Sequence, residues 1–96
     1  MKKDAYRLEI CEDSLINDPL LTFDLDNPLN INIGEEILYA RNIEYAESIH
    51  EHFASMLSTK QSNLSIIVIA KGHYLHEESD FRCYSTRIAV KASKDN

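Results

Sequence analysis

The stretch LSIIVIAK, Leu64 to Lys71, decides the fold, because it contains the longest apolar run in the chain. Its apolar side chains occupy both alternating faces, and most of them are β-branched. A run of this length and composition favours a β-strand over a helix. Since both faces are apolar, we expect this strand to lie at the centre of a sheet.

Towards the C-terminus, FRCYSTRIAVKA (Phe81–Ala92) alternates β-forming residues and is predicted to be a long final strand. It would form a hairpin with Leu64–Lys71, connected by a polar loop of about nine residues. Residues 92–96 are expected to be a flexible polar tail. The loop holds most of the stretch KGHYLHEESDFRCY, which is dense in histidines, carboxylates and tyrosines.

Towards the N-terminus, the period of the apolar residues changes. Ile43, Ala46, Ile49 and Phe53 recur at intervals of three and four, which predicts an amphipathic helix over about residues 43–59. A helix from residue 35 to residue 60 would be about 39 Å long. A compact domain of this size is only about 30 Å wide, so we expect a break near Asn42 or an overhanging helix.

Residues 29–42 are ambiguous. LNINI alternates as a short strand does, whereas Asn32 followed by Glu35 is the spacing of a helix N-cap with its capping partner. We favour a short extended segment or a turn here. Strand, loop and helix all remain open for this region.

Two further strands open the chain. AYRLEIC and LLTFDLD both alternate apolar with polar residues, so we expect each to have one buried and one solvent-exposed face. We expect them to pair as antiparallel neighbours. The element order is then ββαββ, and the fold class is α+β: one domain over residues 1–96, with a four-stranded, mostly antiparallel sheet and one helix packed on one face.

The net charge of −6 is unevenly distributed. Residues 1–60 hold twelve acidic and five basic side chains, whereas residues 61–96 hold four and five. A nucleic-acid surface needs a basic footprint, and no run of the chain supplies one. An anionic membrane would repel the same charge. The sequence therefore predicts neither nucleic-acid nor membrane binding, and leaves a basic protein as the partner that the charge favours.

The N-terminus lacks the apolar core of a secretion signal, because Asp4, Arg7 and Glu9 interrupt it. Cys11 and Cys83 are far apart and form no CxxC motif, as expected for reduced thiols in a cytoplasmic protein. If the first and last strands were adjacent, the two thiols could meet. No apolar run approaches the roughly 20 residues of a membrane span.

A metal site is one alternative for the polar stretch. His73, His76 and Glu77 carry ligand types that zinc uses. Their order is H-Y-L-H-E, however, and not the H-E-x-x-H that places two imidazoles on one face of a helix. Catalytic patterns are also missing, because the chain has no G-x-S-x-G and only two glycines with which to build a phosphate loop. We therefore expect no enzyme activity and no cofactor.

The predicted helix offers the better functional candidate. Glu44, Glu47 and Glu51 are spaced by three and four residues and form one acidic stripe. No Lys or Arg on the helix follows any of them by four residues. Asp24 and Asp26 could extend this field, and Tyr74 is a further candidate contact with a partner. A small sheet also leaves two edges open, so a homodimer is possible.

Two hypotheses follow. The first is a small acidic, non-enzymatic intracellular protein that binds a larger protein and regulates or inhibits it. In size and charge it is similar to small acidic inhibitors of nucleic-acid-handling machinery, so the partner could carry a basic surface of that kind. The alternative is a metal-binding protein or sensor using His73, His76 and Glu77. A ligand pocket between helix and sheet is a third possibility, supported only by the layered architecture.

Overall fold

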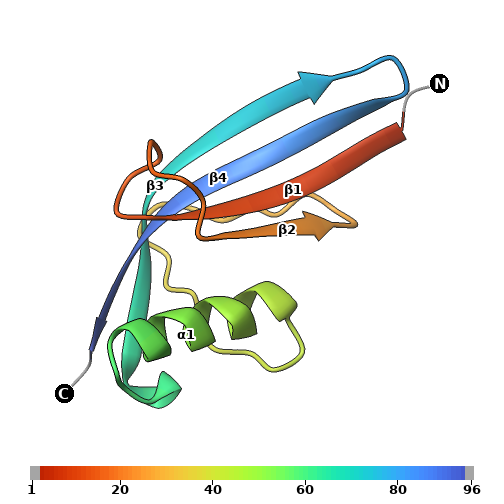
Figure 1. Cartoon of the computed structure of the whole chain (residues 1–96). Coiled ribbons are helices and arrows are strands. Elements are labelled where there is room, and N and C mark those ends of the chain that lie inside the picture. The colour runs from red at the N-terminus through yellow and green to blue at the C-terminus, as the bar shows by residue number, and fades with distance from the viewer. Residues whose placement is uncertain (1–2, 95–96) are drawn as a thin grey trace.

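The computed structural model describes residues 3–94, which form a four-stranded mixed sheet with one helix (Figure 1). The elements in chain order are β1 (Lys3–Glu12), β2 (Leu21–Leu25), α1 (Glu44–Met56), the short 3-10 turn η1 (Gln61–Asn63), β3 (Leu64–Glu77) and β4 (Phe81–Lys94). The fold is a small α+β domain, as predicted.

Within residues 3–94, no helix combines the length and the apolar character needed to cross a membrane.

The strand order in the sheet is β2-β1-β4-β3. The pairs β1–β2 and β3–β4 are antiparallel, whereas β1 and β4 are parallel from Lys3 opposite Phe81 to Glu12 opposite Val90. The prediction of a mostly antiparallel sheet therefore holds for the two outer pairs and fails at the centre. The cause is the connection through α1, which makes β3 parallel to β2 and thereby leaves β4 parallel to β1.

β3 lies at an edge of the sheet, so the prediction of a central position is wrong. Its first half is covered by other elements instead. On its outer side the chain near residue 35 adds backbone hydrogen bonds: the Gly34 N–H donates to the Val68 carbonyl at 2.7 Å, and the Val68 N–H donates to the Glu35 carbonyl at 2.9 Å. One isolated bridge, between Glu36 and Ile67, completes this cover. The apolar run is therefore shielded without a full neighbouring strand.

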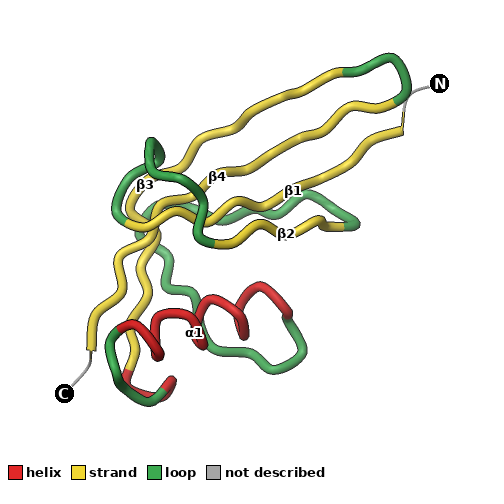
Figure 2. The backbone as a smooth tube through the Cα atoms, in the orientation of Figure 1, coloured by secondary structure: helices red, strands yellow, loops and turns green. Residues whose placement is uncertain are grey.

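The β3–β4 hairpin is longer than expected. β3 continues to Glu77 and β4 begins at Phe81, so only residues 78–80 connect them, and the predicted loop of about nine residues is wrong. A bulge between Val68 and Ala70 shifts the register, and the strand bends in this region (Figure 2). The other end differs too: residues 92–94, expected in the polar tail, belong to β4 and pair with β3, while residues 95 and 96 lie outside the described part.

The expected break before the helix is confirmed. Residues 35–43 are not helical, and α1 occupies 44–56 within the predicted range of 43–59. Residues 29–42 form loops and turns apart from the bridge at Glu36. Asn32 does interact with Glu35, donating from Nδ2 to Oε1 at 2.8 Å, but this bond closes a turn and caps no helix. The preference for an extended segment or turn is therefore correct.

The main core lies between α1 and one face of the sheet. The side chains that α1 buries recur at intervals of three, one and three residues, which places them on one side of the helix. They meet apolar side chains from three strands and from the segment before the helix. The members of this core are Leu8, Ile10, Ile31, Ile37, Ala46, Ile49, Phe53, Leu64, Ile66, Val68, Ile88 and Val90.

The opposite face of the sheet has a smaller cover, formed by the loop 13–20. Cys11 and Ala89 on this face are completely buried. The loop is held by Arg87, whose guanidinium donates to the Leu15 carbonyl at 3.0 Å. The Leu15 side chain lies close to Gly72, 3.5 Å from where a Cβ would be. The loop thus reaches across β4 to β3 before the chain returns to β2.

The two cysteines do not meet, although β1 and β4 are adjacent. Ala5 lies opposite Cys83 and Ala89 lies opposite Cys11, so the thiols are six residues apart along the strand direction. At about 3.3 Å per residue this is about 20 Å, far beyond disulfide distance. Both cysteines are free and buried.

One buried histidine fastens the segment before the helix to α1. His50 is 3% exposed, and its Nε2–H donates to the Ile37 carbonyl at 2.6 Å. Its ring also packs edge-to-face against Tyr39, with centroids 5.6 Å apart. The bond links α1 to the same segment that covers the outer side of β3.

Replacing His50 tests this link. We expect His50→Leu to lower the free energy of unfolding by about 1–3 kcal/mol, because the Ile37 carbonyl loses its donor while staying buried. His50→Gln can still donate from its amide and should lose clearly less. Urea denaturation of both variants makes the comparison. Equal losses in the two variants would show that the hydrogen bond contributes little.

Burial also protects the Cys11 thiol. The pKa of Cys11 is raised, chiefly by burial, while the nearby Arg87 charge opposes the shift. A thiol with a raised pKa and no exposed surface forms little reactive thiolate near pH 8. We expect iodoacetamide to modify Cys11 at least tenfold more slowly in the native protein than in urea, measured by peptide mass spectrometry. Equal rates in the two conditions would mean that the loop 13–20 does not cover the thiol.

Candidate protein-binding surface

The acidic stripe (Glu44, Glu47 and Glu51) lies on the outer side of α1. At 100° per residue the three positions fall within about 60° of the helix circumference, on the side opposite the buried residues. Glu44 and Glu51 are exposed and Glu47 is partly buried. Among residues 3–94, none of the three carboxylates has an ion pair or a side-chain hydrogen bond. The helix therefore presents three uncompensated negative charges.

Three acids of the sheet, Asp4, Glu9 and Asp24, are arranged differently, because an arginine pairs with each of them. Glu9 and Arg87 are 3.2 Å apart and largely buried, and this hydrogen bond raises the pKa of Arg87. Asp4 pairs with Arg82 at 3.2 Å on a more exposed part of the sheet. These arginines thus neutralise three acids of the sheet, and none of them pairs with a glutamate of α1.

The structure does not bring Asp24 into the acidic stripe. Asp24 accepts a hydrogen bond from Arg7 at 3.1 Å, and this bond raises the pKa of Arg7. Its strand neighbour Phe23 points the other way and packs against Tyr45 of α1, with ring centroids 6.4 Å apart. Asp24 therefore faces away from the helix. Asp26 is exposed just after the end of β2.

Tyr74 is also separate from the helix. It lies on the outer part of β3 and is 50% exposed. The Arg87 guanidinium sits over its ring, 5.3 Å from the centroid. The ring leans back towards Gly72, 3.6 Å from where a Cβ would be. Tyr74 is thus an exposed aromatic surface held in place by a cation, at a different location from the acidic stripe.

The histidines of the polar stretch lie on a strand, which changes their relation. His73 and His76 are separated by three positions and so project from opposite faces of β3. His73 Nδ1 lies 3.4 Å from the Thr86 hydroxyl, and His76 Nε2 lies 3.1 Å from Glu78 Oε1. The two imidazoles cannot coordinate one ion from these positions. Within residues 3–94, no group of three His, Cys, Asp or Glu side chains is placed to hold a metal.

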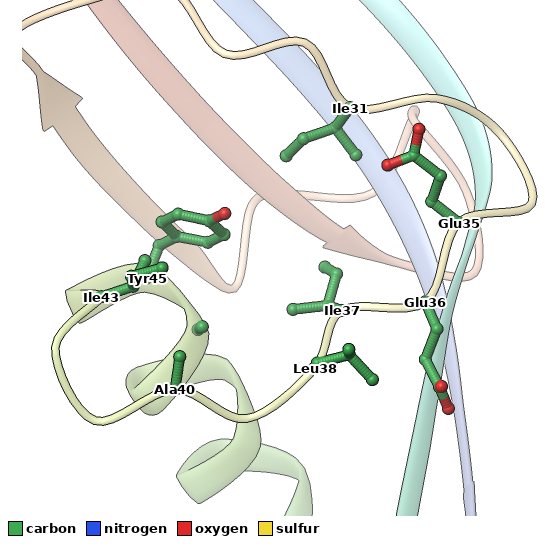
Figure 3. A pocket seen from close by; sticks show the side chains of 9 residues that line it. Ile31, Glu35, Glu36, Ile37, Leu38, Ala40, Ile43 and Tyr45 are labelled. Atoms are coloured by element: carbon green, nitrogen blue, oxygen red, sulfur yellow. The ribbon is translucent and has the colours of Figure 1, made fainter.

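A cavity of about 260 Å³ lies between the first turn of α1 and the segment before it (Figure 3). This is smaller than the roughly 300–1,000 Å³ of most small-molecule sites. Glu35 and Glu36 line it but hydrogen-bond to Asn32 and Ser65, respectively. The full lining is Ile31, Glu35, Glu36, Ile37, Leu38, Ala40, Ile43, Tyr45 and Ala46.

The sequence interpretation missed a second exposed feature, the distal edge. We use this name for the outer edge of β3 from Lys71 to Glu77. β3 is the outermost strand of the sheet, and its first half is covered near residue 35. In KGHYLHE, polar residues occur on both faces of the strand. The alternation of apolar and polar residues that identifies strands was therefore too weak to predict that β3 extends this far.

No protein-family model matches the sequence, and neither the curated proteins nor the solved structures contain a significant match.

Two charge reversals on α1 test the electrostatics of the acidic stripe. Glu51→Lys removes a repulsion with Glu47 and creates a Glu–Lys pair in the favourable order, so we expect a gain of about 0.5 kcal/mol in the free energy of unfolding. Glu44→Lys changes the net charge equally but places a cation in the first turn, against the helix dipole, and should lose about 0.3–1 kcal/mol. Urea denaturation at low salt measures both. Shifts of the same sign would point to net charge rather than position on the helix.

Proposed function

We propose that the chain is a small acidic, non-enzymatic cytoplasmic protein that binds a larger protein and regulates or inhibits it. The acidic stripe on α1 is the proposed contact, and a basic surface is the proposed complement, such as one that handles nucleic acid. The observation that carries the proposal is the contrast in pairing: arginines pair with Asp4, Glu9 and Asp24 of the sheet, while all three helix glutamates are uncompensated.

A fold-stabilising role accounts for only part of this arrangement. Glu44 and Glu47 lie in the first turn of α1, where the helix dipole favours negative charge. Glu51 has no such benefit, and as a like charge one turn from Glu47 it costs a few tenths of a kcal/mol. A residue that slightly weakens the isolated protein is understandable if it contributes when a basic partner is bound.

The physical effect of such a stripe is on encounter and orientation. Uncompensated charges on one face attract a surface of opposite sign over about 10 Å at moderate salt and align the two proteins. A partner that normally holds phosphates would be blocked at the bound surface. Because nucleic acid itself is repelled, the chain would act on the protein and not on the nucleic acid.

The two cysteines support the cytoplasmic location that we propose. Cys11 and Cys83 are free and about 20 Å apart, so neither can close a bond with the other. Free buried thiols are typical of proteins that work in a reducing compartment.

Affinity capture with matched variants tests the stripe. The tagged wild-type chain, a helix variant (Glu44→Gln, Glu47→Gln, Glu51→Gln) and a control variant (Glu12→Gln, Asp18→Asn, Asp80→Asn) are each incubated with extract of the source cell. Both variants lose three negative charges, but only the first loses those of α1. We expect one partner to be retained by the wild type and the control, with about tenfold weaker binding to the helix variant.

The salt dependence completes this test. Binding of the captured partner should weaken strongly between about 0.05 and 0.5 M salt for the wild type, and much less for the helix variant. Circular dichroism verifies that both variants are folded. If the folded helix variant retains every partner as tightly as the wild type, the acidic stripe is not the binding surface.

A further inference from the structure

We propose that the cavity beside the first turn of α1 binds one aromatic side chain of a partner protein, carried on a segment with lysine or arginine next to that side chain. This inference deepens the proposed function and rests on it for the partner being a basic protein. The acidic stripe would attract and orient that protein, and the cavity would hold one of its side chains.

The size of the cavity matches a single side chain. Its volume is about 260 Å³. An apolar cavity of roughly 150 Å³ already holds a benzene molecule, whereas sites for whole small molecules begin at roughly 300 Å³. An aromatic ring therefore fits inside the cavity while the main chain of the partner stays outside it.

The lining offers apolar contacts to such a ring. Figure 3 shows the side chains of Ile31, Ile37 and Tyr45 pointing toward a common space. Two further lining residues, Leu38 and Ile43, are 69% and 43% exposed, so apolar surface at this site is in contact with water. A partner that covers this surface gains the free energy of burying it, and Tyr45 adds an aromatic neighbour for the ring.

The walls of the cavity are held in place by the fold. The Ile37 N–H donates to the Ile66 carbonyl at 2.8 Å, and the Ile37 carbonyl accepts the hydrogen bond from His50. The Tyr45 ring packs against Phe23 of β2. Because these walls are already ordered, binding at the cavity has a smaller entropic cost than binding to a flexible surface.

The charge around the cavity selects a basic segment. In the described part of the chain, the two charged residues that line it, Glu35 and Glu36, are both acidic. Their hydrogen bonds are with the neutral side chains of Asn32 and Ser65, which leave both charges in place. Across residues 31–47 the chain holds four acidic side chains and one basic side chain. A lysine or arginine next to the aromatic residue therefore meets opposite charge at the rim.

The cavity also adjoins the acidic stripe. Ile43 and Tyr45 of the lining directly flank Glu44, the first residue of α1. The basic residue of this region, Arg41, is exposed and lies outside the lining. One bound segment can therefore place an aromatic residue in the cavity and a basic residue near the stripe.

Two synthetic peptides test the site on the full chain. The first is Gly-Lys-Lys-Phe-Lys-Lys-Gly, blocked at both ends, and the second has alanine in place of phenylalanine. Both carry the same charge, so a difference in affinity reports the aromatic side chain alone. In NMR titrations at low salt, we expect the phenylalanine peptide to bind about tenfold more tightly, as burial of one large apolar side chain predicts.

The same titrations locate the site in the wild-type chain. We expect the amide shifts that differ between the two peptides to fall within residues 31–46, which contain the whole lining. Differences centred on the distal half of β3 would place the aromatic side chain elsewhere and overturn the proposal.

Filling the cavity provides a second test. Ala40→Phe adds a ring to its lining, so the two peptides should then bind about equally. Ala5→Phe adds the same ring at an exposed position of β1 and, as the matched control, should keep the preference. Leu38→Asn is a milder change at an exposed part of the lining and should reduce the preference about threefold. Circular dichroism verifies that each variant is folded.

Removing the charges at the rim tests the basic part of the ligand. The double variant Glu35→Gln, Glu36→Gln keeps both hydrogen-bond acceptors, and we expect it to bind both peptides about threefold more weakly at low salt. The control Glu12→Gln, Asp18→Asn loses the same charge elsewhere and should bind them nearly as the wild type does. Unchanged binding by the rim variant would show that the site does not select a cation.

The outcomes separate this inference from the proposed function. Equal binding of the two peptides to the wild type, or a preference that survives Ala40→Phe, overturns the cavity site and leaves the acidic stripe to its own test. If the preference holds while the helix variant retains every cellular partner as tightly as the wild type, the acidic stripe is ruled out and the cavity stands as a peptide site.

Discussion

The parallel pairing of β1 with β4 is the constraint on which the rest of the structure depends. It joins the first and last strands over ten residues and places Leu8 and Ile10 beside Ile88 on the face that α1 covers. Both strands are interior in the sheet, where β2 pairs with Tyr6–Ile10 of β1 and β3 pairs with nearly all of β4. β2 and β3 then pair antiparallel on the outer sides of β1 and β4, and the connection through α1 covers the core.

Local patterns predicted the elements well but not their neighbours. The alternation around Leu8 and Phe23 and the helical period around Ile49 each report burial of one face, and each element formed where the pattern placed it. A pattern does not state which element covers the face. The apolar run Leu64–Ala70 illustrates this, because the segment near Glu35 and not a neighbouring strand covers its outer side.

For the candidate site too, the sequence predicted positions that depend on local spacing and not those that depend on distant contacts. The spacing of Glu44, Glu47 and Glu51 correctly placed them together on the outer side of a helix. Asp24 could not be placed, because its partner Arg7 is set by strand register, which depends on contacts distant in sequence. Tyr74 was named as a candidate contact with a partner, but the strand that carries it was interpreted as a loop because both of its faces are polar.

The pairing of the first strand with the last also has a consequence for biosynthesis. The ribosome makes β1 well before β4, so the central pair of the sheet cannot form until β4 has also been made. Until then, the apolar face of β1 at Leu8 and Ile10 lacks its main partner strand. A nascent chain in this condition exposes an apolar strand face that favours aggregation. Its protection depends on chaperones or on rapid folding once β4 is available.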